Sequence, residues 1–187
     1  MDILAHALWT GIGTTLARRR KPIAPQTVAL TVGLAAVPDL LHLLPIISWW
    51  LAGDGTFAVL QAYAIALPGQ EPALPPLVNL WSHHLHCITH SAVLAGAVTL
   101  LSWVVLRSLW IPLLGWWSHI VIDLFTHSAD YYPVEALYPL SKYTFNGLAW
   151  NTPWFLLLNY VLLAGTALWL VITRRAKRSG PDTNRQD

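Results

Sequence analysis

The chain has 187 residues, of which 55% are hydrophobic and 11% are charged, and its mean hydropathy is +0.49. This composition is too apolar for an ordinary water-soluble domain, and the length suits one compact helical bundle. The formal net charge is only +2, and the basic residues gather at the ends of apolar segments, so we expect no nucleic-acid partner. The single cysteine, Cys87, excludes an intramolecular disulfide.

Apolar segments divide the chain into five predicted transmembrane helices. They cover about Ile3–Ala17, Gln26–Leu51, His86–Leu106, Trp110–His127 and Pro153–Thr173. The first is short for a span, whereas the last is the clearest because its roughly 21 residues carry no charge. We therefore predict an all-α integral membrane protein, with one transmembrane domain over residues 1–178 and the lipid bilayer as its partner.

Two longer connections, residues 52–85 and 128–152, are predicted to be loops on the outer side. Within the first, the apolar stretch Thr56–Leu67 is too short to span and predicts an interfacial or re-entrant helix before the proline-rich run Pro68–Pro76. The polar tail, residues 179–187, is predicted to be a disordered cytoplasmic segment.

The basic residues predict the orientation of the helices. If the N-terminus faces outward, ten of the eleven Lys and Arg residues lie on one side and only Lys142 lies opposite. By the positive-inside rule that side is cytoplasmic. We expect a multi-pass protein of the cell (inner) membrane with its C-terminus in the cytoplasm.

Histidines and aspartates recur at helical spacing inside these apolar segments. They are His6, the pair Asp39 and His42, the pair His86 and His90, and the series His119, Asp123 and His127. At 1.5 Å per residue these residues, His86 apart, lie roughly 18–30 Å from the basic edges of their helices. Four helices thus bring polar groups to one layer in the outer half of the membrane.

The aspartates in this layer need a compensating charge. A mid-helix Asp costs roughly 2.5–3.5 kcal/mol on insertion scales, and no predicted span contains a Lys or Arg to neutralise it. Imidazolium, a protonated carboxyl group or a bound metal must do so. Structural zinc sites bind with about 10–16 kcal/mol, which is enough to offset this cost.

The spacing of the polar residues indicates which of them would bind the metal. His119 and Asp123 lie one helical turn apart and can share an ion, or can simply pair with each other. Asp39 follows Pro38, and a proline kink opens room for a site, or leaves backbone groups that the nearby polar side chains satisfy. The candidate ligands are His6, Asp39, His42, His90, His119 and Asp123. Mixed imidazole and carboxylate donors favour zinc, with manganese or iron as alternatives.

The remaining histidines have other predicted roles. His127 and His86 are the candidate general acid and base, because imidazole titrates near neutral pH. His83 and His84 are expected to be solvated at the membrane interface. Serines adjoin two of the histidines, but no nucleophile-elbow pattern is present, so a serine nucleophile is disfavoured.

Short motifs at these positions give the chain a family resemblance. They are Pro-Asp-x-x-His at Pro38–His42, Thr-His-Ser at Thr89–Ser91, Gly-x-x-Ser-His-x-x-x-Asp-x-x-Thr at Gly115–Thr126 and Tyr-Pro-Leu at Tyr138–Leu140. With His6, they cover about three quarters of the chain, which resembles the YdjM-like family of bacterial membrane-bound metal-dependent hydrolases. It departs from the family at Leu41, where a second acid often stands, and at Leu85–Cys87, where the family often carries His-Arg-Gly. A neighbour such as His86 or His84 would then supply the missing ligand.

These patterns predict a metal-dependent hydrolase acting in the outer half of the membrane, on a lipid or phosphoester substrate that arrives from the bilayer. A metal lowers the pKa of bound water from 15.7 toward about 7. The alternative is a metal or proton transporter, since intramembrane His and Asp residues serve that role as well. A transporter would need polar groups on the cytoplasmic side, where these segments offer almost none. Haem ligation by histidine pairs is a further alternative.

Overall fold

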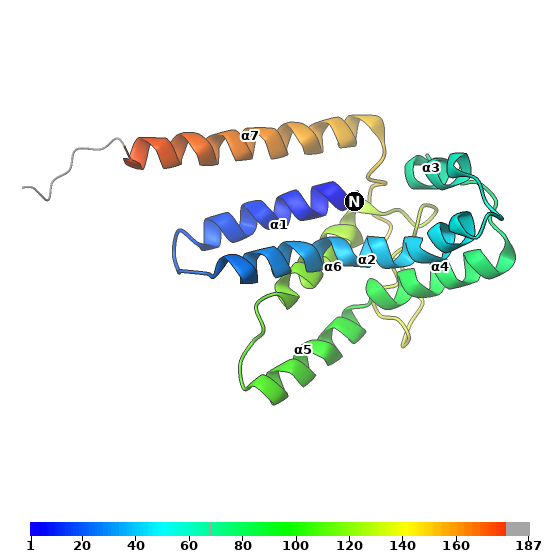
Figure 1. Ribbon diagram of the computed structural model, residues 1–187, viewed down its shortest axis with the longest axis horizontal. Coiled ribbons are helices and arrows are strands. Elements are labelled where there is room, and N and C mark those ends of the chain that lie inside the picture. The colour runs from blue at the N-terminus through cyan, green and yellow to red at the C-terminus, as the bar shows by residue number, and fades with distance from the viewer. Residues whose placement is uncertain (68, 179–187) are drawn as a thin grey trace, which may run out of the picture.

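The computed structural model describes residues 1–67 and 69–178, and within these ranges the chain forms seven α-helices and no strand (Figure 1). The helices are α1 Ile3–Ala17, α2 Pro25–Leu51, α3 Phe57–Ile65, α4 Pro76–Thr89, α5 Ala92–Leu106, α6 Leu113–Thr126 and α7 Pro153–Arg178. The all-α prediction is confirmed, as is a short helix near Thr56–Leu67. The predicted tail, residues 179–187, lies outside the described residues.

Two helices are long and apolar enough to cross a membrane, namely α2 and α7. A third span is formed if α4 and α5, which meet at a bend of 53°, cross the membrane together. Helices α1 and α6 have 15 and 14 residues. At 1.5 Å per residue each covers only about 22 Å of a hydrocarbon core that is about 30 Å thick. The structure therefore contains two or three membrane-spanning elements by length and composition.

The predicted third span, His86–Leu106, is wrong in its outline. Helix α4 begins ten residues earlier, at Pro76, inside the stretch predicted as an outer loop, and the chain breaks at His90 before α5 begins. The cause of the break is Ser91, whose hydroxyl oxygen accepts the Leu94 N–H (3.1 Å) and donates to the Tyr138 carbonyl (2.5 Å). This N-cap starts a new helix in a new direction.

Helix α2 is the centre of the bundle and packs against α1, α4 and α6. The contact with α6 is close at Gly115, where an added Cβ would collide with the carbonyl oxygen of Thr31. Glycine therefore lets the two backbones touch, and one turn later the His119 ring reaches the Ala35 carbonyl (2.8 Å). The glycine thus determines how deeply α6 inserts its polar side chains.

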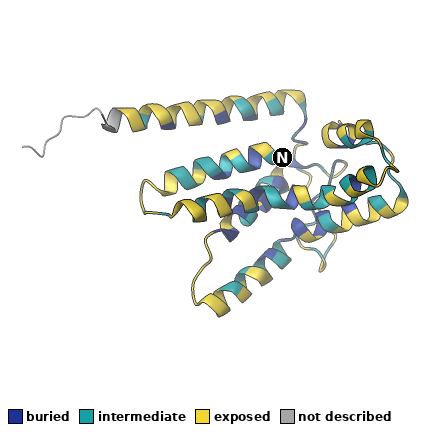
Figure 2. Cartoon of the chain, viewed as in Figure 1, coloured by how far each residue is buried: buried dark blue, intermediate teal, exposed yellow. Residues whose placement is uncertain are grey.

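Helices α1 and α7 run side by side in the same direction (Figure 1). Trp9 Nε1 donates to Asn159 Oδ1 (2.8 Å) near one end, and Arg19 Nη2 donates to Thr173 Oγ1 (2.7 Å) at the other. The outer surface of α7 is mostly exposed, like that of α5 (Figure 2). Large apolar side chains on these two helices, Leu100, Leu101, Val105, Leu157 and Leu168, are 60–69% exposed. So much exposed apolar surface fits contact with lipid.

Candidate metal centre

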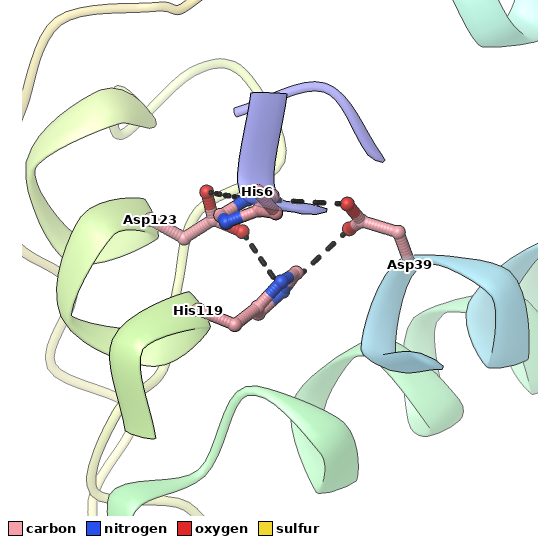
Figure 3. Close-up of side chains that lie close together, drawn as sticks. All are labelled: His6, Asp39, His119 and Asp123. Carbon is pink, nitrogen blue, oxygen red and sulfur yellow. Dashed lines mark hydrogen bonds and ion pairs between the residues drawn. The ribbon is translucent and has the colours of Figure 1, made fainter. Parts of the chain in front are cut away.

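Four polar side chains from three helices converge in the interior of the bundle (Figure 3). They are His6 of α1, Asp39 of α2, and His119 and Asp123 of α6. One ligand atom from each lies within 4.8 Å of the others, and all four residues are buried. These four are among the six ligands predicted from the sequence, and the structure brings them together.

Asp123 is the centre of this group. Its Oδ1 atom lies 2.9 Å from His6 Nε2, and its Oδ2 atom lies 3.1 Å from His119 Nε2. The second carboxylate, Asp39, is more loosely placed, with Oδ1 3.7 Å from His119 Nε2 and Oδ2 4.0 Å from His6 Nε2. Figure 3 shows the two carboxylates on opposite sides of the imidazole rings. The arrangement leaves donor atoms facing one another around a common point.

His90, the fifth predicted ligand, lies directly beside the four. Its Nε2 atom is 2.9 Å from His119 Nε2 and 3.2 Å from Asp123 Oδ2. This position depends on the break between α4 and α5, because His90 is the C-cap residue of α4. His127, at the end of α6, adds a further nitrogen, with Nε2 3.5 Å from Asp123 Oδ1. The N-terminal ammonium of Met1 also contacts Asp123.

Three of these histidines are oriented by the backbone. Nδ1 of His90 donates to the His86 carbonyl (2.9 Å), that of His119 to the Ala35 carbonyl (2.8 Å), and that of His127 to the Tyr132 carbonyl (2.7 Å). A carbonyl oxygen can only accept, so each Nδ1 carries the proton and a neutral ring presents a lone pair at Nε2. Metal-ligating histidines are commonly held in this way by their second nitrogen.

The contact between His90 and His119 is therefore unusual. Two Nε2 atoms that both carry lone pairs lie 2.9 Å apart and are completely buried. Such a pair repels unless a proton or a cation lies next to both nitrogens. With Asp39 and Asp123 adjacent, the position favours positive charge. The donor set therefore fits a metal ion, and it contains imidazole and carboxylate groups without a thiolate.

The sixth predicted ligand, His42, lies outside the group of four. Its ring centroid is 6.4 Å from that of His90 and 5.5 Å from that of His86, the predicted acid or base. The His86 ring stacks on the His90 ring at 4.0 Å. His42 and His86 thus form a separate pair of rings beside the group of four.

Several residues at the site carried no functional prediction. A cavity of about 270 Å³ adjoins the centre and is lined by the phenol rings of Tyr63, Tyr131 and Tyr132, among others. Burial raises the pKa of the Tyr132 phenol well above its usual value, so the group stays protonated. In the sequence, Tyr131 and Tyr132 follow His127 by four and five residues. Their closeness to a candidate site residue was the signal that could have identified them. Tyr63 lies on α3 and had none.

A second group of ligand-type side chains lies between α4 and the α6–α7 connection. His83, Cys87 and Glu135 each place one atom within 4.8 Å of the other two. His83 and its neighbour His84 are exposed, as predicted.

Comparison of the chain with protein-family models, with curated proteins and with solved structures gave no match. Fold and site together define an α-helical protein with helices able to cross a membrane and a buried His/Asp cluster that can hold a metal ion.

Proposed function

We propose that this protein is a membrane-bound metal-dependent hydrolase, with His6, Asp39, His119 and Asp123 as the core of its metal centre and His90 as a further ligand. The observation that carries the proposal is the buried contact of two lone-pair nitrogens, His90 Nε2 and His119 Nε2, at 2.9 Å. A divalent cation removes their repulsion and also balances the two carboxylates. Zinc suits these donors best, and manganese or iron is an alternative.

A bound divalent cation would supply Lewis acidity, which lowers the pKa of water toward neutrality and polarises an ester oxygen. The protein would supply the proton transfer. His127 has its Nδ1 proton held by the Tyr132 carbonyl, and its ring lines the cavity. Its Nε2 atom, which the Met1 ammonium contacts at 3.1 Å, would take a proton and later return it to a leaving group. His86, which also lines the cavity, is the alternative proton carrier.

The lining of the cavity suits a substrate with an apolar part. Its wall includes Leu4, Leu43 and Trp150 beside the polar residues of the centre. We propose an amphiphilic ester or phosphoester that enters from the bilayer, because the centre is buried among helices whose outer surfaces are apolar. The resemblance of the sequence to YdjM-like membrane-bound hydrolases implies the same reaction class, and membership of that family is itself proposed.

The proposed orientation has the N-terminus outside and the C-terminus in the cytoplasm of a bacterial inner membrane, with five crossing segments, of which α1 and α6 are short and require local thinning of the bilayer. The α1–α2 connection, the end of α5 and the end of α7 lie toward one side of the molecule (Figure 1). They carry Arg18–Lys21, Arg107 and Arg174, and the positive-inside rule makes that side cytoplasmic.

The test is hydrolysis of a panel of phospholipids and isoprenoid phosphates by purified protein in detergent. We expect product release that requires metal, stops in chelator and is lost in Asp123→Asn. The matched control is His84→Asn, a change at an exposed position of α4. Metal-loaded protein that is inert on every ester, but moves metal or protons across liposomes, would replace the hydrolase with a transporter.

A further inference from the structure

The cavity beside the metal centre contains buried nitrogen atoms without partners. His86 is 5% exposed, and neither of its ring nitrogens makes a hydrogen bond. His42 Nδ1 is also buried and unpaired. Both residues line the cavity. Buried polar atoms nearly always have partners, so these two adjacent imidazoles are available to bind a ligand in the cavity.

Carboxylate oxygens in the same wall show what kind of ligand would bind there. Oδ2 of Asp39 and Oδ2 of Asp2 are buried and lack hydrogen-bond partners, and both residues line the cavity. An ionised carboxylate can only accept hydrogen bonds and repels an anion. The cavity therefore accommodates positive charge.

We propose that the cavity holds a second divalent transition-metal ion, bound by His42 and His86 and sharing the Asp39 carboxylate with the first. This inference rests on the proposed metal centre, because Asp39 is the link between the two ions. The ring centroids of His42 and His86 are 5.5 Å apart, with the planes at 79°. Two imidazoles on one tetrahedral ion have centroids roughly 5 Å apart.

The position of Asp39 suits a bridging carboxylate. Its Oδ1 atom faces His90 and His119, at 3.6 and 3.7 Å, while its Oδ2 atom lies 4.0 Å from His6 Nε2 and makes no hydrogen bond. Asp39 also lines the cavity together with His42 and His86. In two-metal hydrolases the ions lie about 3.5–4 Å apart, a spacing that one carboxylate can bridge. The carboxylates of Asp2, Asp39 and Asp123 do not fully neutralise two dications. The pair of ions would therefore attract an anionic substrate such as a phosphoester.

The test is Mn²⁺ binding to metal-free protein in detergent, with bound ions counted per chain and the spectrum recorded by electron paramagnetic resonance. Wild-type protein is expected to bind two ions and to show the multiline spectrum of an exchange-coupled pair. His42→Ala and His86→Ala should each bind one ion and give an uncoupled spectrum. The control His84→Ala, on the exposed surface of α4, should retain two coupled ions.

Two outcomes separate this inference from the proposed function. One ion in the wild type, unchanged in His42→Ala and His86→Ala, would overturn the second site and leave the first metal centre intact. No bound ion in any folded variant would overturn both. If an alanine variant fails to fold by circular dichroism, His86→Gln, which keeps the side-chain volume, replaces it and must also lose one ion.

Discussion

At the residue scale, the site depends on one carboxylate more than on any other group. Asp123 is completely buried, and its carboxylate oxygens lie 2.9–3.2 Å from the Nε2 atoms of His6, His90 and His119. A buried carboxylate surrounded by imidazoles binds a cation tightly, whereas an amide in its place keeps the shape and loses the charge. Asp123 is therefore the residue at which a conservative substitution has the clearest consequence.

We expect Asp123→Asn to weaken zinc binding by at least about 100-fold, because even outer partners of a metal ligand contribute about 10–100-fold. The measurement is competition with a chromophoric chelator in detergent. Asp54→Asn, at an exposed position after α2, is the control and should bind like the wild type. Equal zinc affinity in Asp123→Asn and wild type would contradict the assignment.

The histidines of α4 provide a second comparison. His90→Ala should lower zinc affinity by about 10–100-fold, since His90 Nε2 lies 3.2 Å from Asp123 Oδ2. His83→Ala removes an exposed imidazole about two turns earlier on α4 and should leave the central ion in place. Metal analysis of the two purified variants decides between them. A greater loss of bound zinc in His83→Ala than in His90→Ala would place the ion at the group of His83, Cys87 and Glu135.

Helical spacing was sufficient to predict most residues of the cluster. His119 and Asp123 lie one turn apart on a single helix, and the depth estimate placed His6 and Asp39 in the same layer. The separation of His42 from the group of four was not predictable. It depends on which neighbouring helix packs against each face of α2, and the sequence alone does not show this. The backbone carbonyls that orient the rings were hidden as well, since they belong to other segments of the chain.

At the element scale, the contact between α2 and α6 positions half of the centre. Gly115→Ala should destabilise the protein by about 1–3 kcal/mol, because the added methyl group meets the Thr31 carbonyl oxygen and the helices must separate. In an unconstrained helix the same change stabilises by up to about 1 kcal/mol. Gly165→Ala in α7, where nothing lies within 4 Å of the new Cβ, is the matched control.

Thermal unfolding in detergent measures both glycine variants. A melting temperature that falls for Gly115→Ala and holds or rises for Gly165→Ala is the expected result. If Gly115→Ala is as stable as wild type and keeps its metal, α6 is not pressed against α2 at this point.

Element boundaries were predictable wherever composition changes abruptly. The observed bounds of α1 match the predicted segment, because the basic run from Arg18 ends the apolar stretch. The boundary between α4 and α5 was missed because the polar residues Thr89, His90 and Ser91, which interrupt the apolar run there, were assigned to the interior of one span. The chain changes direction there through the Ser91 cap and its bond to the Tyr138 carbonyl, a residue 47 positions away. No local pattern reports such a contact.

At the scale of the whole molecule, the distribution of basic residues predicts the orientation. A cysteine placed at Gln70, an exposed position between α3 and α4, should react with a membrane-impermeant maleimide added outside intact cells. The background is Cys87→Ser, so that the new thiol is the only one in the chain. Labelling of Gln70→Cys only after the cytoplasmic side is opened would invert the topology and move the centre to the inner half.

The central claim is that the cluster of His6, Asp39, His119 and Asp123 binds a metal ion. X-ray absorption at the zinc edge of protein purified without added chelator tests it most directly. We predict a shell of nitrogen and oxygen ligands with the multiple-scattering pattern of imidazole, no sulfur ligand, and loss of the signal in Asp123→Asn. A sulfur ligand would locate the metal at Cys87, and the absence of any metal from folded, reconstituted protein would contradict the claim.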